Sequence, residues 1–226
     1  MTIKGIIFDF DGVILDTEVP EYQSWQELYT EFDQYLTIEK WATYIGAGVN
    51  AFDPFEYLEE LIGKKLDEKE LKTRRFDRSQ ELLEKQELIP NVLDFIENAR
   101  KNGLKLAVAS SSDRPWVEGH LRKYGIFELF DIVHTCEDVE NVKPDPALFL
   151  TALKSLKIDK TEALVIEDSP NGILAAKRAD LFCVCIPNQI TSQMDTSMAD
   201  IQLVSLAELN VDGLLMEDFS STLLTS

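Results

Sequence analysis

The chain has 226 residues, of which 45% are hydrophobic and 28% are charged, which is the composition of an ordinary globular protein. Its 41 acidic and 22 basic residues give a formal net charge of −19. Such a surface repels phosphate backbones, so we expect no nucleic-acid partner. An anionic substrate would have to be held by a local positive site.

The sequence also bears on location. It contains no apolar stretch of membrane-spanning length, and its N-terminus lacks the basic region and apolar core of a signal peptide. The three cysteines, Cys136, Cys183 and Cys185, form no Cys-x-x-Cys pair, and an odd count without a framework is typical of reduced thiols. We therefore expect a cytoplasmic protein with no membrane partner, and we take it to be a monomer.

Strand and helix patterns alternate along most of the chain. Short apolar runs that are typical of strands lie at 3–8, 104–109, 131–135, 163–166 and 182–186. Patterns typical of helices lie at 92–101, 116–124, 147–156 and 172–179. Apolar strands that alternate with helices indicate a parallel sheet covered on both faces. The sequence therefore predicts an α/β fold with a doubly wound, mainly parallel Rossmann-like sheet.

A long segment after the first strand breaks this alternation. Residues 17–88 are rich in Glu, Leu, Lys and aromatic residues, and helical periodicity recurs at 22–32, 55–61 and 68–84. We predict that 17–88 form an α-helical cap inserted into a core of 1–16 and 89–226. The tryptophans Trp25, Trp41 and Trp116 are interpreted as packing residues.

Two carboxylates follow the first strand, in Asp9-Phe10-Asp11-Gly12. A buried, unpaired carboxylate strongly disfavours folding, so the pair indicates that a cation or a reacting group compensates it. Side chains two residues apart can face the same side of an extended chain. One carboxylate could then attack phosphorus and carry the group covalently, and the other could exchange a proton with the leaving oxygen and with water.

Polar residues also follow the other predicted strands. The second strand ends in Ser110-Ser111-Ser112, Lys143 lies after the third, and the fourth ends in Glu167-Asp168. Ligands of an open parallel sheet gather at the carboxyl ends of its strands, so these groups should meet. Oxygen ligands without Cys or His favour Mg²⁺. Together with a lysine, a hydroxyl and free helix N–H groups, such a cation suits a phosphoryl group.

These motifs together resemble those of the haloacid dehalogenase-like hydrolase superfamily. The chain carries DFDGV from Asp9, a serine at the second strand end, VKPDP around Lys143 and IEDSPNG from Ile166, in the family's order. The resemblance implies that Asp9 is the nucleophile and Asp11 the general acid and base. It implies that Ser110, Ser111 and Lys143 bind the phosphoryl group. It implies Mg²⁺ held by Asp9, the Asp11 carbonyl and Asp168, with Glu167 as an additional ligand.

Within this superfamily the chain is similar to the β-phosphoglucomutase-like phosphatases, and it departs from the true mutases. The mutases carry a cap-hinge histidine where this chain has Glu21, and a Lys-Asn pair where it has Asp113-Arg114. Both differences favour a phosphatase that acts on a small phosphorylated metabolite, such as a sugar phosphate. Candidate substrate contacts at the hinge and in the cap are Thr17, Glu21 and Asn50.

Two alternatives stay open at this point. A phosphosugar mutase would use the same phosphoaspartate, but it would return the group to a bound intermediate. A non-enzymatic phospho-acceptor module would also combine acids, a hydroxyl and a lysine around Mg²⁺. Such modules lack the second acid two residues after the acceptor, and they lack a large helical insert.

Overall fold

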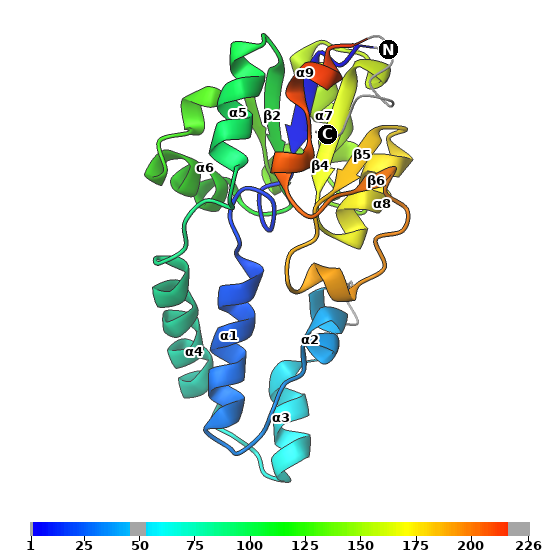
Figure 1. Ribbon diagram of the computed structural model, residues 1–226. Helices are drawn as coiled ribbons and strands as arrows, with labels where there is room; N and C mark the ends of the chain where they lie inside the picture. Colours follow the sequence, from blue (N-terminus) through cyan, green and yellow to red (C-terminus); the bar gives the residue numbers. More distant parts are fainter. Residues whose placement is uncertain (1, 46–52, 217–226) are drawn as a thin grey trace.

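The computed structural model describes residues 2–45 and 53–216. Six strands form one sheet in the order β3-β2-β1-β4-β5-β6, and each pairing between neighbouring strands is parallel (Figure 1). The strands are β1 (Gly5–Phe8), β2 (Lys105–Ala109), β3 (Ile132–His134), β4 (Ala163–Glu167), β5 (Phe182–Cys185) and β6 (Ile201–Gln202).

Helices cover both faces of this sheet. On one face, apolar side chains of β1, β2 and β4 share a buried cluster with α5 (Val92–Lys101), α6 (Arg114–Lys123) and α9 (Val211–Leu214). On the other face, a second cluster joins the sheet to α7 (Ala147–Leu156) and α8 (Pro170–Arg178). A sheet buried on both faces needs nearly continuous apolar strands, and every residue of β1 is buried. The predicted doubly wound parallel fold is confirmed.

The observed elements extend the sequence prediction in two places. The two-residue strand β6 and the four-residue helix α9 were not predicted, because segments so short show no measurable periodicity. Short 3₁₀ helices complete the connections: η1 (Phe127–Leu129), η2 (Cys136–Asp138), η3 (Lys160–Glu162), η4 (Thr191–Gln193) and η5 (Leu206–Glu208).

Four helices lie between β1 and α5 in the chain. They are α1 (Glu18–Thr30), α2 (Ile38–Ile45), α3 (Pro54–Ile62) and α4 (Glu68–Leu83), and α1 and α4 lie side by side below the sheet (Figure 1). Their shared core includes Trp25, Trp41 and Phe55, which confirms the packing role of the first two. All four helices fall within 17–88, where we predicted the cap; α2 was not predicted, and the boundaries themselves stay a prediction.

The helical part is joined to the sheet at two places. Leu15 and Leu88 form an antiparallel bridge, and the Ile89 N–H donates to the Ile14 carbonyl at 3.0 Å, so the two connecting segments run side by side. In addition, Ile190, which follows β5, is buried within the core of the four helices. These contacts hold α1 over the carboxyl ends of the strands.

Within the described residues, no helix combines the length and the apolar character needed to cross a membrane. The cytoplasmic location and the monomeric state stay predictions.

Candidate active site

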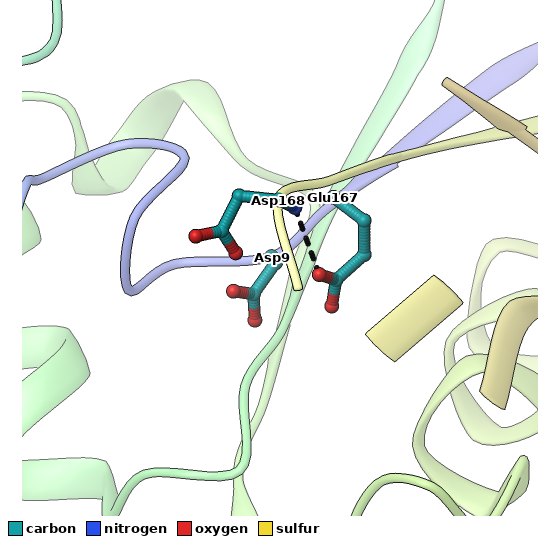
Figure 2. A group of neighbouring side chains, drawn as sticks. All are labelled: Asp9, Glu167 and Asp168. Carbon is teal, nitrogen blue, oxygen red and sulfur yellow. Dashed lines mark hydrogen bonds between the residues drawn. The ribbon is translucent and has the colours of Figure 1, made fainter. Parts of the chain in front are cut away.

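Three carboxylates meet where β1 and β4 end. The two strands pair in register up to Phe8 and Ile166, and the Asp9 N–H donates to the Ile166 carbonyl at 2.9 Å. This register places Asp9 beside Glu167 and Asp168, and carboxylate oxygens of the three lie within 4.8 Å of one another (Figure 2). All three residues are buried. The strand ends predicted from the sequence are therefore brought together.

Lys143 provides the positive charge in this cluster. Its Nζ lies 2.5 Å from Asp9 Oδ1 and 2.8 Å from Glu167 Oε1, and its side chain is only 5% exposed. Burial alone would lower the pKa of Lys143, but the two carboxylates outweigh it and raise the pKa. Burial raises the pKa of Asp9 to about 8; Glu167 and Asp11 add to this rise, and Lys143 opposes it.

Glu167 is held from both sides. Its Oε1 accepts from Lys143, while its Oε2 accepts from the N–H groups of Asp168 and Ser169, at 2.9 and 3.0 Å, and from the Ser169 hydroxyl at 3.1 Å. Gly172 makes room for this carboxylate, because a Cβ at that position would lie 1.6 Å from Glu167 Oε1. Glu167 thus fixes Lys143 beside Asp9.

Asp168 lies against the loop that follows β1. Its Oδ2 accepts a hydrogen bond of 2.9 Å from Asn188, which the sequence analysis did not identify. Gly12 has φ +83°, and a Cβ there would lie 2.2 Å from Asp168 Oδ2, so this position requires glycine twice over. Burial and the charges of Glu167 and Asp9 raise the pKa of Asp168.

Asp11 is oriented by four hydrogen-bond donors. Its Oδ1 accepts from Thr17 Oγ1 and from Trp116 Nε1, each at 3.0 Å. Its Oδ2 accepts from Ser112 Oγ at 2.6 Å and from Ser110 Oγ at 3.3 Å. Two of these donors, Ser112 and Trp116, were absent from the predicted site. They come from the loop after β2 and from the first turn of α6.

The predicted serines lie at different depths. Ser110 is fully buried, and its hydroxyl turns toward Asp11 while accepting from the Ser112 N–H. Ser111, the next residue, lines the cavity. Because neighbouring side chains of an extended segment point to opposite sides, only one of the two can open directly onto the cavity.

These groups surround one cavity of about 410 Å³ between the sheet and α1. Thr17 and Glu21, predicted as substrate contacts, line it; Asn50 lies outside the described residues. Further lining residues that the sequence did not single out for this site are Glu18, Ser112, Trp116, Asn171, Thr191 and Met194. Trp116 packs against the core, as predicted, and its indole N–H also reaches Asp11, which was not predicted.

The helical side of the cavity is acidic. Burial, together with the neighbouring Asp11 and Glu21 charges, raises the pKa of the half-buried Glu18 to about 8. Glu21 Oε1 pairs with Arg75 Nη1 at 2.6 Å.

The carboxylate cluster fits a hard divalent cation. Asp9, Glu167 and Asp168 each offer a carboxylate oxygen, and these oxygens lie within 4.8 Å of one another. Among the described residues that line the cavity, Lys143 is their one basic partner. Burial and the neighbouring carboxylates raise the pKa values of Asp9 and Asp168, and Lys143 is the cation that opposes this rise. A second cation would relieve that repulsion, and all-oxygen donor sets suit Mg²⁺.

A family model described as haloacid dehalogenase-like hydrolase matches residues 6–186. The chain belongs to this family. The resemblance expected from the four strand-end motifs is thereby confirmed. The matched segment of this hydrolase contains every predicted site residue, from Asp9 just after β1 to Asp168 just after β4.

Known proteins resemble this hydrolase along nearly their whole length. It is 44% identical to "Putative phosphatase YhcW" of Bacillus subtilis, over 97% of this chain and 99% of that protein. It is similar to the crystal structure of CbbY from Rhodobacter sphaeroides in complex with phosphate, with 28% identity, a TM-score of 0.68, and 92% and 96% of the two chains covered. A hydrolase of the same family from Deinococcus radiodurans shares the fold, with 24% identity, a TM-score of 0.79, and 95% and 98% covered.

The residues of this site that the sequence did not reveal share one property. Ser112, Trp116 and Glu18 line the cavity, and Asn188 bonds to Asp168, only because separate elements pack around the site. One signal was present for Trp116: it lies in the first turn of a helix that starts right after a strand end, and such turns border the ligand edge of a parallel sheet.

Proposed function

We propose that the chain is a Mg²⁺-dependent phosphatase that hydrolyses a small phosphorylated metabolite through a phosphoaspartyl intermediate on Asp9. One observation carries this proposal: Asp9 is buried between Lys143 and Asp168, in the same cavity as Asp11. Membership of a hydrolase family, a relative named as a phosphatase and a similar structure that binds phosphate support it.

In the first step, a carboxylate oxygen of Asp9 attacks phosphorus. Lys143 contacts Oδ1 of Asp9, which leaves Oδ2 for the new bond to phosphorus. As that bond forms, the bond between phosphorus and the leaving oxygen breaks. Asp11 gives its proton to the leaving oxygen, so the alcohol departs neutral.

In the second step, water attacks the phosphorus of phosphoaspartate. Asp11, now a carboxylate, takes the proton of this water, and the bond between phosphorus and Asp9 breaks. Inorganic phosphate leaves and the Asp9 carboxylate is restored. Both steps need Asp11 in one orientation, and four donors fix it there.

Asp9, Asp168 and the main-chain carbonyl of Asp11 would hold Mg²⁺, which would supply positive charge against the phosphoryl oxygens. Glu167, predicted as an additional ligand, already accepts hydrogen bonds at both oxygens, so we propose that its main task is to fix Lys143. Lys143 and Ser111 bind the phosphoryl oxygens. Ser110 does not contact the phosphoryl group in this proposal; it holds Asp11 and the Ser112 main chain in place from the buried side.

The two alternatives find less support. A mutase would place a histidine at the hinge, whereas Glu21 stands there. The two histidines of the chain, His120 and His134, lie within α6 and β3 of the core. A phospho-acceptor module would need neither Asp11 nor a substrate cavity under helical cover.

The test compares Asp9→Asn with the wild-type protein on a panel of phosphorylated metabolites, with released phosphate as the readout. We expect wild-type turnover that needs Mg²⁺ and disappears with a chelator. We expect Asp9→Asn to fold normally and to lose turnover. Asp180→Asn is the matched control, because Asp180 is exposed and pairs with Lys160. Normal turnover by Asp9→Asn would refute the assignment.

A further inference from the structure

The wall of the cavity has a strong excess of acidic groups. Six of its lining residues are acidic, and Lys143 is the one basic residue among those that the structure describes there. Lys143 is already matched by two carboxylates at the reaction centre. On the side of the cavity where the leaving group would lie, the helical part contributes two further acidic residues, Glu18 and Glu21. Even with a divalent cation bound, acidic groups outnumber positive charges.

One basic side chain of the helical part, Arg75, pairs with a residue of this wall but does not itself line the cavity. Arg75, on α4, donates from Nη1 to Glu21 at 2.6 Å and to Ser24 Oγ at 3.0 Å, and its guanidinium lies 4.7 Å from the ring centroid of Trp25. Its side chain is 13% exposed, and it is not among the lining residues. Glu21 therefore neutralises Arg75 and keeps it behind the wall.

The segment between α2 and α3 cannot reverse this balance. Residues 46–52 read Gly-Ala-Gly-Val-Asn-Ala-Phe and contain no Lys, Arg or His. Whatever their position, they bring no positive charge to the cavity.

We infer that the substrate carries no second anionic group, and that its leaving group presents hydrogen-bond donors, either hydroxyl or ammonium, to Glu18 and Glu21. This inference rests on the proposed phosphatase activity. A second carboxylate or phosphate would face the carboxyl groups of Glu18 and Glu21 and would find no free basic side chain among the described lining residues. An anion left without a partner among carboxyl groups is disfavoured, and such a mismatch discriminates between substrates. At a separation of about 5 Å, one like charge disfavours binding at least ~10-fold even in a partly hydrated site.

Three two-carbon phosphomonoesters of similar size isolate this effect. They are 2-hydroxyethyl phosphate with a neutral end, phosphoethanolamine with an ammonium, and 2-phosphoglycolate with a carboxylate. We expect kcat/KM for 2-phosphoglycolate to be at least ~10-fold below that for 2-hydroxyethyl phosphate. The ratio between the neutral and ammonium esters then shows which donor the site prefers.

A variant tests the role of Glu21 directly. Glu21→Gln removes the partner of Arg75, so we expect the preference against 2-phosphoglycolate to shrink by about tenfold as the guanidinium becomes free to pair with the carboxylate. The double variant Glu21→Gln/Arg75→Gln should lose that gain. Glu31→Gln is the control, because it removes the exposed Arg74–Glu31 pair, which also joins α4 to the end of α1, and it should leave all ratios unchanged.

The outcomes separate the two proposals. Turnover of p-nitrophenyl phosphate, which has an uncharged nitroaryl leaving group, first establishes phosphatase activity. If that ester and all three others stay intact with Mg²⁺, the phosphatase proposal falls, and this inference falls with it. If they are hydrolysed and 2-phosphoglycolate equals or exceeds the neutral ester, the inference alone is overturned. The inference would also be overturned if, in a folded Glu21→Gln protein, the ratio of kcat/KM for 2-phosphoglycolate to that for 2-hydroxyethyl phosphate stayed as in the wild type.

Discussion

The indole Nε1 of Trp116 donates a hydrogen bond of 3.0 Å to Oδ1 of Asp11. Thr17 Oγ1, where the chain leaves the sheet for α1, donates to the same oxygen. One carboxylate is thus held jointly by the first turn of α6 and by the segment that leads into the helical part. The orientation of the proposed general acid therefore depends on elements that are distant in sequence.

Trp116→Phe should lower kcat about tenfold with little change in KM. The ring keeps its place against His120, but Asp11 loses one of the donors that fix its orientation, and small misplacements of a catalytic group are costly. Steady-state kinetics together with a melting curve separate this effect from a loss of stability. A folded variant with wild-type kcat would show that Trp116 does not position Asp11.

Lys143→Met should destabilise the metal-free protein by about 3 kcal/mol or more, because it leaves two buried carboxylates without their cation. Added Mg²⁺ should restore part of this loss by supplying positive charge to the same carboxylates. Urea denaturation with and without Mg²⁺ measures both effects.

The control for that variant is Lys160→Met, which removes an exposed pair with Asp180. Such pairs contribute ~0–1 kcal/mol, so we expect little change. Equal losses in the two variants would contradict the importance of the buried pair.

Gly172→Ala should disrupt the site, because its Cβ would meet the Glu167 carboxylate at 1.6 Å and would push it away from Lys143. We expect a large loss of activity and of stability. Gly119→Ala is the matched control within α6: no atom lies within 4 Å of its added Cβ, so alanine should stabilise the helix by about 0.5–1 kcal/mol. A Gly172→Ala protein as active as the wild type would contradict the observed packing.

Glu18→Gln should change how stability depends on pH. The pKa of Glu18 rises from 4.5 to about 8 on folding, so its favourable contribution is present below pH 4.5 and is lost as pH rises through 8. Glutamine does not titrate, so the stability of the variant does not fall in this way as pH rises. In chelator, the melting temperature of Glu18→Gln minus that of the wild type should therefore increase between pH 5 and pH 8.5. A difference that stays constant across this range would count against the raised pKa.

The parts of the site that lie next to a strand could be predicted from the sequence. Asp9, Lys143 and Asp168 follow apolar runs directly or within a short connection, and parallel topology then brings strand ends to one edge. Glu167 could be placed at that edge, but not its bonds to the Asp168 and Ser169 N–H groups, because these depend on the local turn.

The rest of the site depends on tertiary packing, which leaves no local pattern. Asn188 reaches Asp168 from the segment after β5, and Trp116 turns its polar edge inward although its ring packs like a core residue. The Glu21–Arg75 pair joins α1 to α4 through two residues that are 54 positions apart in sequence. No spacing rule connects such residues before the helices are placed.

The central claim is that Asp9 carries the phosphoryl group, and trapping the phosphorylated protein tests it most directly. Wild-type protein is mixed with Mg²⁺ and a substrate found in the panel, quenched in acid within one turnover, digested, and mapped by mass spectrometry. We predict an acyl phosphate on Asp9, absent from Asp9→Asn and released by hydroxylamine. Phosphate release without any phosphorylated Asp9 peptide, or with the label on another residue, would contradict the account.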